Sequence, residues 1–168
     1  MIEIERKFLV RDDSYKAMAH RSYRIRQGYI CSGHGHTVRV RQRDEQGFLT
    51  IKGPSLDGGL SRYEFEKEIT LDEATQLFRL CRNGIIDKTR HLVAMPDGHT
   101  FEVDEFHGDN EGLVVAEVEL SAPDEHYDRP PFLGEEVTTD RRYTNASLSR
   151  SPYSQWSGTG SPSPGSSL

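Results

Sequence analysis

Glu3, Glu5 and Lys7 lie two residues apart near the start of the chain. Side chains two apart share one face of a β-strand, so an extended segment at 1–10 would align two carboxylates with an ammonium group. One such segment by itself is more typical of a solvated strand. The spacing recurs many times along this chain, usually with one sign of charge in each segment, and this recurrence favours a functional site.

The recurring charges divide into basic and acidic segments. The basic sets are Arg24 with Arg26, Arg39 with Arg41, Lys52, and Lys88 with Arg90, and the acidic sets are Glu64 with Glu66, Glu102 with Asp104, and Glu117 with Glu119. Same-sign neighbours about 7 Å apart repel each other, so an ordinary solvated sheet gains nothing from this arrangement. It suits a site in which carboxylates hold a divalent metal and basic residues hold a polyanion.

Short strands are the elements that would position these side chains. Alternation of apolar and polar residues predicts strands at 1–10, 22–30, 37–42, 48–52, 61–70, 85–95, 100–106 and 113–120. A helix is predicted at 73–81, with Asp72 as its N-cap and Asn83-Gly84 as its stop signal. Two shorter helices are expected, one near Asp124 and one at 140–148.

About eight strands of this kind can close into a small antiparallel barrel, which removes the exposed edges of a sheet. Ordinarily the apolar faces of the strands point inward. The opposite lining would place the charged faces around a hydrated tunnel and cover the outside with helices and apolar packing. Strand periodicity leaves both linings open, and the number of same-sign pairs favours the charged interior.

Composition sets the domain organisation and excludes some functions. The 168 residues predict one domain at 1–148 and a disordered tail at 149–168 that is rich in Ser, Pro and Gly. A net charge of −6 argues against sequence-independent nucleic-acid binding, and no apolar run is long enough to cross a membrane. We expect no signal peptide, and Cys31 and Cys81 are expected to be free thiols in a reducing cytoplasm.

Ten short segments, in order along residues 1–148, together resemble one protein family. They are 5–10 (ERKFLV), 26–29 (RQGY), 39–41 (RVR), 50–52 (TIK), 59–66 (GLSRYEFE), 88–90 (KTR), 101–104 (FEVD), 117–119 (EVE), 134–138 (GEEVT) and 140–143 (DRRY). With the Glu-x-Glu-x-Lys at Glu3, they are similar to the CYTH, or triphosphate tunnel metalloenzyme, superfamily. The compact bacterial triphosphatases of that superfamily are the members that the chain resembles most.

This resemblance implies a mainly β fold, a closed eight-stranded antiparallel barrel whose charged faces point inward, with a few covering helices. Members bind a triphosphate in the tunnel and hydrolyse or transform it with Mg²⁺ or Mn²⁺. By position, Glu3, Glu5 and Glu119 would ligate metal, and Glu117, Asp104, Glu64 and Glu66 would be further ligands or would hold metal-bound water. Hard divalent cations prefer such oxygen ligands.

The resemblance also assigns the basic residues. Lys7, Arg39, Arg41, Lys52, Lys88 and Arg90 would bind the phosphate chain, and Arg141 or Arg142 would add a contact near the tunnel mouth. Arginine suits this task because its guanidinium donates two parallel hydrogen bonds to phosphate oxygens. Lys88 is the candidate catalytic residue, which would orient the attacking water or assist the leaving group.

Several functions fit the same tunnel. Hydrolysis of inorganic tripolyphosphate is the leading hypothesis. A class IV adenylate cyclase or a thiamine triphosphatase is an alternative, although no base-binding insert or aromatic pair is evident in the sequence. A non-catalytic polyphosphate-binding module is an alternative of another class. Members of the family are often dimers, so a homodimer is a further expectation.

Overall fold

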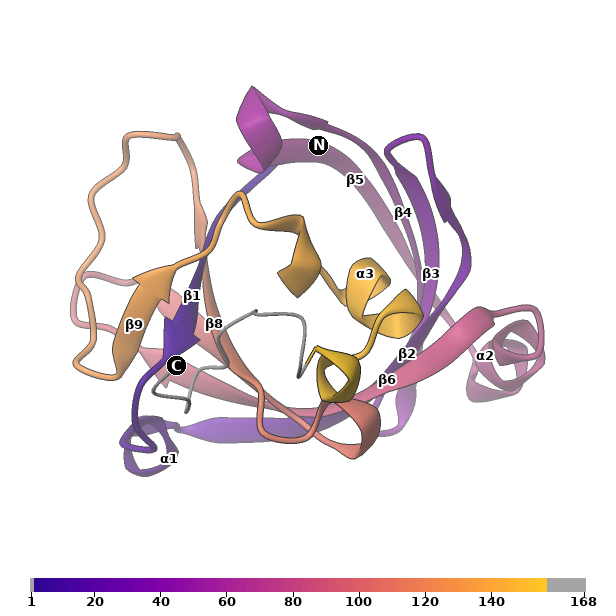
Figure 1. Ribbon diagram of the computed structural model, residues 1–168, viewed down its shortest axis with the longest axis horizontal. Coiled ribbons are helices and arrows are strands. Elements are labelled where there is room, and N and C mark those ends of the chain that lie inside the picture. Colours follow the sequence, from indigo (N-terminus) through magenta and orange to yellow (C-terminus); the bar gives the residue numbers. More distant parts are fainter. Residues whose placement is uncertain (1, 157–168) are drawn as a thin grey trace.

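Eight antiparallel strands close into a barrel in this computed structural model, which describes residues 2–156 (Figure 1). The strands are β1 (Ile2–Val10), β2 (Arg21–Gly33), β3 (His36–Arg43), β4 (Gln46–Leu56), β5 (Ser61–Ile69), β6 (Arg82–Ala94), β7 (Thr100–Phe106) and β8 (Val114–Leu120). They follow one another around the barrel in the order β5-β4-β3-β2-β6-β7-β8-β1, and β1 pairs with β5 to complete the circle. The predicted fold class is confirmed.

Strand β1 closes the barrel. One of its edges pairs with β8 over most of its length. On the other edge its first residues pair with β5, with Glu3 opposite Arg62. The end of β1 pairs instead with a ninth strand, β9 (Leu133–Glu136), which the sequence pattern does not predict. Closure between β1 and β5 therefore depends on a short ladder that extends only from Ile2 to Ile4.

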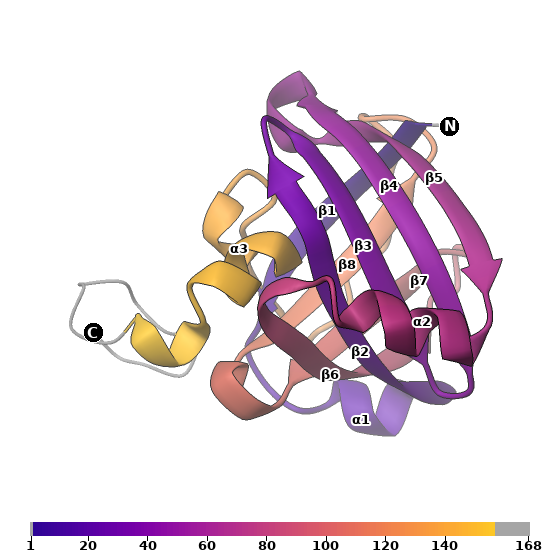
Figure 2. The same cartoon turned by 90° about the vertical axis from the view of Figure 1, so that its right-hand side faces the viewer.

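Helices α1 (Tyr15–Met18) and α2 (Leu71–Phe78) lie outside the ring of strands, and α3 (Asn145–Arg150) lies across one open end of the barrel (Figure 1). The one-turn 3-10 helices are η1 (Asp57–Gly59), η2 (Gly108–Asn110), η3 (Arg141–Tyr143) and η4 (Tyr153–Gln155). Figure 2 shows α2 across the outer face of the sheet near β2 and β3. None of the described helices has the length and apolar character needed to span a membrane.

The structure corrects three predicted helix features. Thr70 is the N-cap of α2 because its hydroxyl accepts from the Glu73 amide, and the Glu73 carboxylate accepts from the Thr70 amide in return. This reciprocal capping box displaces the predicted cap by two residues. The helix ends at Phe78, so Cys81 lies outside it, and the region around Asp124 forms a turn instead of a helix.

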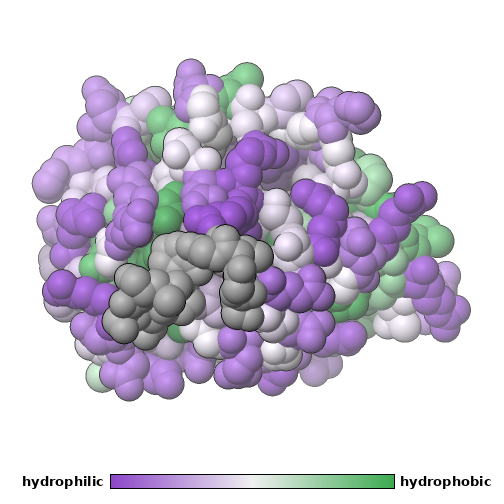
Figure 3. Space-filling view, viewed as in Figure 1, coloured by the Kyte–Doolittle hydropathy of each residue, from purple (hydrophilic) through white to green (hydrophobic). Residues whose placement is uncertain are grey.

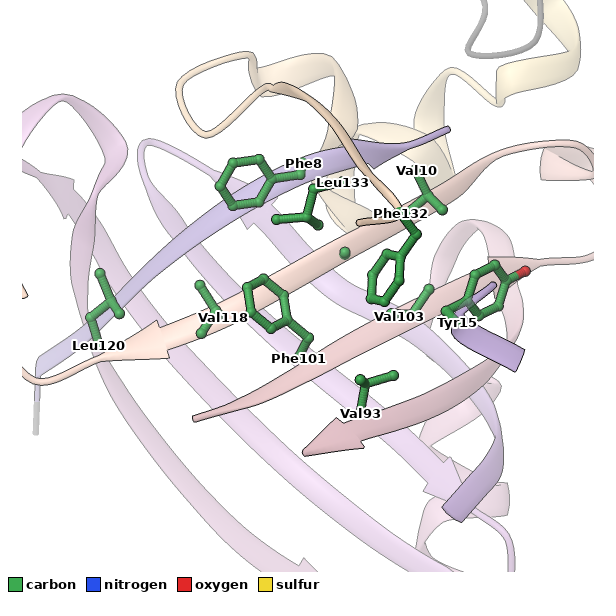
Figure 4. Packing of buried hydrophobic residues seen from close by; sticks show 11 residues of the cluster. Phe8, Val10, Tyr15, Val93, Phe101, Val103, Val118, Leu120, Phe132 and Leu133 are labelled. Carbon is green, nitrogen blue, oxygen red and sulfur yellow. The ribbon is translucent and has the colours of Figure 1, made fainter. Parts of the chain in front are cut away.

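An apolar core lies on the outside of the barrel wall. The outer faces of β1, β6, β7 and β8 carry most of its buried side chains, and α1 and the segment before β9 cover them (Figure 4). For example, the Phe132 ring packs against the Tyr15 ring with centroids 5.9 Å apart. Because the apolar faces turn outward here, the charged faces of the same strands turn inward.

Two basic residues nevertheless lie on the outer surface. Arg24 forms an ion pair with Asp87 at 2.7 Å, and the Arg26 guanidinium lies over the Phe78 ring of α2. Their neighbours Ile25 and Gln27 are fully buried. On β2 the side chains of Ile25 and Gln27 therefore point into the protein, and those of Arg24 and Arg26 point outward. The prediction that grouped Arg24 and Arg26 with the inward-facing charges was wrong.

A second apolar cluster and α3 close one end of the barrel. Tyr143 and Leu148 are buried there, and the Trp156 ring packs against Tyr143 with centroids 5.2 Å apart. The packed domain therefore continues past the predicted boundary at residue 148, since Ser149 and Trp156 are both buried. Aromatic residues within a Ser- and Pro-rich sequence provide the anchor. The rest of the predicted tail, 157–168, lies outside the described residues.

We predict that Trp156→Ala lowers the free energy of unfolding by about 3 kcal/mol, because it removes a large buried side chain and leaves a cavity. Urea unfolding followed by circular dichroism would measure the change. Leu80→Ala is the matched control, since Leu80 is 59% exposed and its loss should cost no more than about 0.5 kcal/mol. Equal effects of the two substitutions would show that the C-terminal segment is not part of the cooperative fold.

His99 joins the turn before β7 to the segment that covers the outer core. Its Nε2 bonds the Glu125 carboxylate, and its Nδ1 lies 3.0 Å from an Asp97 oxygen. Asp97 in turn accepts from the Asp128 amide at 2.7 Å. Hydrogen bonds to the Asp97 and Glu125 carboxylates raise the pKa of His99, so the charged imidazole favours this junction.

We predict a stability difference between wild type and His99→Gln that depends on pH. The stabilisation is fully present below the unfolded histidine pKa of about 6.5, and it is lost as pH rises through the higher pKa of folded His99. In thermal melts, the melting temperatures of wild type and His99→Gln should therefore differ more at pH 5.5 than at pH 9. His126→Gln, at a side chain that is 87% exposed, should show no such difference.

Candidate active site

All eight barrel strands contribute side chains to one internal cavity of about 540 Å³. Figure 3 shows the molecule from the same side as Figure 1, where the surface is mainly hydrophilic. Twelve of the predicted site residues line the cavity: Glu3, Glu5, Lys7, Arg39, Arg41, Lys52, Glu64, Glu66, Arg90, Glu117, Glu119 and Arg141. The structure thus brings together residues that are spread over most of the sequence.

The cavity has an acidic half and a basic half. The adjacent strands β7, β8, β1 and β5 supply the lining glutamates, while β6, β3 and β4 supply Arg90, Arg39, Arg41 and Lys52. Lys7 lies among the acidic strands, with its Nζ 4.0 Å from a Glu117 oxygen and 3.2 Å from the Tyr143 carbonyl oxygen. Such a division places cation ligands and anion ligands on facing walls of a single chamber.

Arginines of the basic half have unused hydrogen-bonding capacity. Arg39 Nη2 donates to the Thr50 hydroxyl at 3.0 Å, but the buried Arg39 Nε has no hydrogen-bond partner among the described residues. Burial, together with the positive charges of Arg39 and Arg90, lowers the pKa of Arg41 to about 9. A bound polyanion would satisfy these donors and relieve the repulsion between the guanidinium groups.

Carboxylates of the acidic half are crowded together. Glu5 lies directly opposite Glu119 in the β1–β8 ladder. Burial raises the pKa of Glu5 well above its usual range, and the nearby carboxylates of Glu117 and Glu3 raise it further. Burial likewise raises the pKa of Glu119, with contributions from Glu3 and Glu102. Excess negative charge of this kind is stabilised by a bound cation.

The donor set fits a hard divalent cation, because every candidate ligand is a carboxylate. Glu3 is held by Lys52 at 2.9 Å, and Lys52 also lies 3.5 Å from Glu64. Within residues 2–156, no three Asp, Glu, His or Cys side chains are yet arranged to hold a metal ion together.

Lys88 and Asp104 lie behind the cavity wall. Lys88 is fully buried and donates to Asp104 Oδ2 at 2.7 Å, while Arg90 donates to both Asp104 oxygens at 2.8 and 2.9 Å. Asp104, predicted as a metal ligand or water-holder, therefore faces these two cations instead of the cavity. Burial lowers the pKa of Lys88 to about 7, although Asp104 opposes this shift.

The C-terminal segment supplies cavity residues that the sequence pattern did not indicate. Thr144, Asn145 and Arg150 line the cavity, and Arg150 donates to the Ser32 hydroxyl at 2.9 Å, which ties α3 to β2. Arg150 lies in the predicted tail at 149–168, whereas Thr144 and Asn145 lie in the predicted helix at 140–148, where no charged pattern distinguishes them. Arg62 on β5 also lines the cavity, and its spacing from Glu64 could have indicated this.

The two candidate arginines of the 140–143 segment lie on different surfaces. Arg141 lines the cavity. Arg142 does not, and its guanidinium forms an ion pair with Asp140 at 2.7 Å and lies over the Trp156 ring. The placement therefore favours Arg141 as the residue near the tunnel mouth.

We predict that Asp104→Asn lowers the free energy of unfolding by about 3 kcal/mol, because it removes the carboxylate paired with the fully buried Lys88 and leaves Arg90 paired with Glu102, at 3.3 Å. Asp87→Asn is the matched control, since its ion pair with Arg24 is largely solvated and worth less than about 1 kcal/mol. Urea unfolding of both variants measures the difference. A small effect at Asp104 would contradict the importance of this buried pairing.

Comparison with known proteins places the chain in a family. The model of the CYTH domain matches residues 1–152. An inorganic triphosphatase of Acetivibrio thermocellus is 46% identical over 154 residues, covering 90% of this chain and 95% of the relative. An inorganic triphosphatase of Nitrosomonas europaea is 38% identical over 157 residues, covering 90% of this chain and 99% of the relative.

Solved structures agree with this placement. The crystal structure of an inorganic triphosphatase superposes with a TM-score of 0.63 at 34% sequence identity and covers 88% of this chain and 97% of its own. The family match spans nearly all of the residues that form the barrel and its charged cavity. This chain therefore belongs to the CYTH domain family.

Proposed function

We propose that this chain is a metal-dependent triphosphatase that hydrolyses inorganic tripolyphosphate in the barrel cavity. The single observation that carries the proposal is the enclosed cavity with one acidic and one basic half, together with relatives named inorganic triphosphatase. A triphosphate is a polyanion that binds with divalent metal, so it needs both kinds of wall. Among the described residues that line the cavity, Tyr29 is the one Phe, Tyr or Trp side chain that could stack on a nucleobase.

In this proposal Glu3, Glu5 and Glu119 hold the metal, and Glu117, Glu64 and Glu66 assist as ligands or hold its water. Mg²⁺ or Mn²⁺ held by these carboxylates would supply charge neutralisation for the phosphate oxygens and a lower pKa for a water molecule. Arg39, Arg41, Arg90, Lys7, Lys52 and Arg141 bind and orient the phosphate chain. Positioning and charge neutralisation of this kind account for most of the catalysis of phosphoryl transfer.

The proposal further assigns Asp104 to a supporting task. Its two oxygens hold Arg90 and Lys88, so it keeps the Arg90 side chain extended along the cavity wall. Lys88 remains the candidate catalytic residue, and its complete burial means that it would reach a water or leaving group only at the inner end of the cavity. We also propose that the protein works in a reducing cytoplasm and forms a homodimer. The free thiols of Cys31 and Cys81 support the first of these.

We predict that phosphate release from tripolyphosphate is fast with Mg²⁺ or Mn²⁺, is abolished by chelator, and is much slower from ATP or thiamine triphosphate. A malachite green assay with each substrate and metal measures this. Cyclic AMP and pyrophosphate from ATP would indicate a cyclase, and preferred release from thiamine triphosphate would indicate that substrate. Binding without any turnover would indicate a polyphosphate-binding module.

We also predict that Lys88→Ala lowers kcat at least tenfold while the metal affinity changes little, because Lys88 does not contact the cavity carboxylates directly. Steady-state kinetics and a calorimetric metal titration separate the two effects. Lys67→Ala is the control, since Lys67 is an exposed residue on β5. Full turnover in Lys88→Ala would remove Lys88 from the mechanism.

Metal binding should weaken as pH falls toward the acidic range. The pKa of Glu5 is raised in the metal-free protein, so a proton competes with the metal for this carboxylate over a wider pH range than usual. Isothermal titration in two buffers of different ionisation enthalpy should show proton release on metal binding. Glu5→Gln should abolish that release, and an unchanged release would mean that another group is the one deprotonated.

A further inference from the structure

A third arginine of β3 lines the cavity and has no role in the mechanism described above. Arg43 follows Arg39 and Arg41 at the same two-residue spacing, and all three line the cavity, so they share the inward face of the strand. The cavity-lining residues of β3 run from His36 to Arg43. Because Arg150 ties α3 to the β2–β3 turn beside His36, Arg43 marks the end of the cavity that lies away from α3.

Two aromatic rings hold the Arg43 guanidinium. Its central carbon lies 4.9 Å from the centroid of the Tyr23 ring and 4.9 Å from the centroid of the Phe48 ring. Tyr23 belongs to β2 and Phe48 to β4, which are the strands on either side of β3. A single hydrogen bond, from Arg43 Nη2 to Gln46 Oε1 at 3.0 Å, adds to these ring contacts.

These contacts leave the charge of Arg43 without a counter-charge. Among residues 2–156, no Asp or Glu side chain forms an ion pair with Arg43, and its buried Nε has no hydrogen-bond partner there. Arg90 differs, because Asp104 accepts two hydrogen bonds from it. A carboxylate fixes an arginine and cancels its charge, whereas the face of an aromatic ring fixes it by cation–π attraction and leaves its charge and remaining N–H donors available.

We propose that Arg43 is a further substrate-binding residue, which donates to a phosphate oxygen at the end of the cavity away from α3, and that Phe48 is a positioning residue for its guanidinium. A phosphate is an anion that would use the unpaired donor and the uncompensated charge together. Strand β3 would then present three guanidinium groups to the phosphate chain. This inference rests on the proposed function, because it adds a contact to the same polyanion, at a residue outside the 39–41 segment on which the family resemblance rests.

An alternative explanation is that the stacked Arg43 side chain only closes one end of the barrel. In that case Arg43→Gln would lower the melting temperature and leave the affinity for tripolyphosphate unchanged. The binding role instead predicts a higher KM for tripolyphosphate with a much smaller change in kcat, because the lost contact is made in both the ground state and the transition state. The two explanations therefore differ in a kinetic readout that folding alone does not move.

Arg43→Gln is the first test, because it removes the charge and keeps a polar side chain. We expect KM for tripolyphosphate to rise roughly tenfold, the value typical for one hydrogen bond to a charged group. Arg26→Gln is the matched control, since the Arg26 guanidinium also lies over an aromatic ring, that of Phe78, but on the outer surface of the barrel. A wild-type KM in Arg43→Gln would overturn the assignment of Arg43.

Phe48→Leu is the second test, because it keeps an apolar side chain and removes the ring face that holds Arg43. We expect it to raise KM in the wild-type background and to add much less in the Arg43→Gln background. Phe65→Leu is the control, since Phe65 is 48% exposed on β5. Independent, additive effects of Phe48→Leu and Arg43→Gln would overturn the positioning role of Phe48.

A measurement on the wild-type protein keeps the proposal testable if a variant fails to fold, which circular dichroism melts would reveal. In protein with ¹⁵N-labelled arginine, the Nε–H signal of Arg43 should shift when tripolyphosphate is added without metal, and the signal of Arg26 should not. An unchanged Arg43 signal at saturating tripolyphosphate would overturn the assignment. Tripolyphosphate binding without hydrolysis would make only the proposed function fail, whereas hydrolysis with an unchanged KM in Arg43→Gln would make only the further inference fail.

Discussion

Charged side chains can line the inside of this barrel only because the apolar faces of the same strands are covered from outside. An ordinary small barrel buries its apolar faces in its own interior. Here the outer faces of β1, β6, β7 and β8 are buried beneath α1 and the segment before β9, with Phe8 and Phe101 at the centre of that layer. The additional covering layer is the structural requirement for a hydrated, charged interior.

Within that interior, stability and ligand binding place opposite demands on the same residues. The cavity lining keeps like charges close together. Burial is the main reason for the raised pKa of Glu5 and the lowered pKa of Arg41, and neighbouring charges of the same sign add to both shifts. The deeper layer is neutralised internally, because Asp104 and Glu102 together balance the charges of Lys88 and Arg90. The protein thus keeps its unbalanced charges at the surface of the cavity, where metal and phosphate can neutralise them, and compensates those it buries completely.

The sequence was sufficient to predict the lining of the cavity but not its depth. Two-residue spacing correctly grouped the charged side chains that share one face of β1, β3 and β8, because side-chain alternation is a local property of a strand. The resemblance to the CYTH superfamily, and not the spacing, indicated that this face points inward. Whether a residue such as Asp104 reaches the cavity or lies behind its wall depends on the stagger of neighbouring strands, which no local pattern encodes. The prediction for β2 was wrong for a similar reason. Arg24 and Arg26 alternate as regularly as Arg39 and Arg41, so the spacing could not show that they point outward.

The C-terminal segment shows a different limit of composition. Ser and Pro outnumber apolar residues after Leu148, yet Tyr153 and Trp156 anchor the segment by packing their rings 5.2 Å apart. Two aromatic side chains supply enough buried area to order a stretch whose average composition is polar. Strand β9 escaped prediction because its four residues are too few to show alternation.

The short ladder between β1 and β5 connects ligand binding in the cavity with the stability of this strand pairing. Glu3 belongs both to that ladder and to the cavity lining. Any ligand that fixes the Glu3 carboxylate must also hold the first residues of β1 against β5, where only a few backbone amides keep the circle closed. Amide hydrogen exchange at the N-terminal end of β1 is therefore thermodynamically linked to occupancy of the cavity, and this seam is a natural place for an isotope or fluorescent reporter.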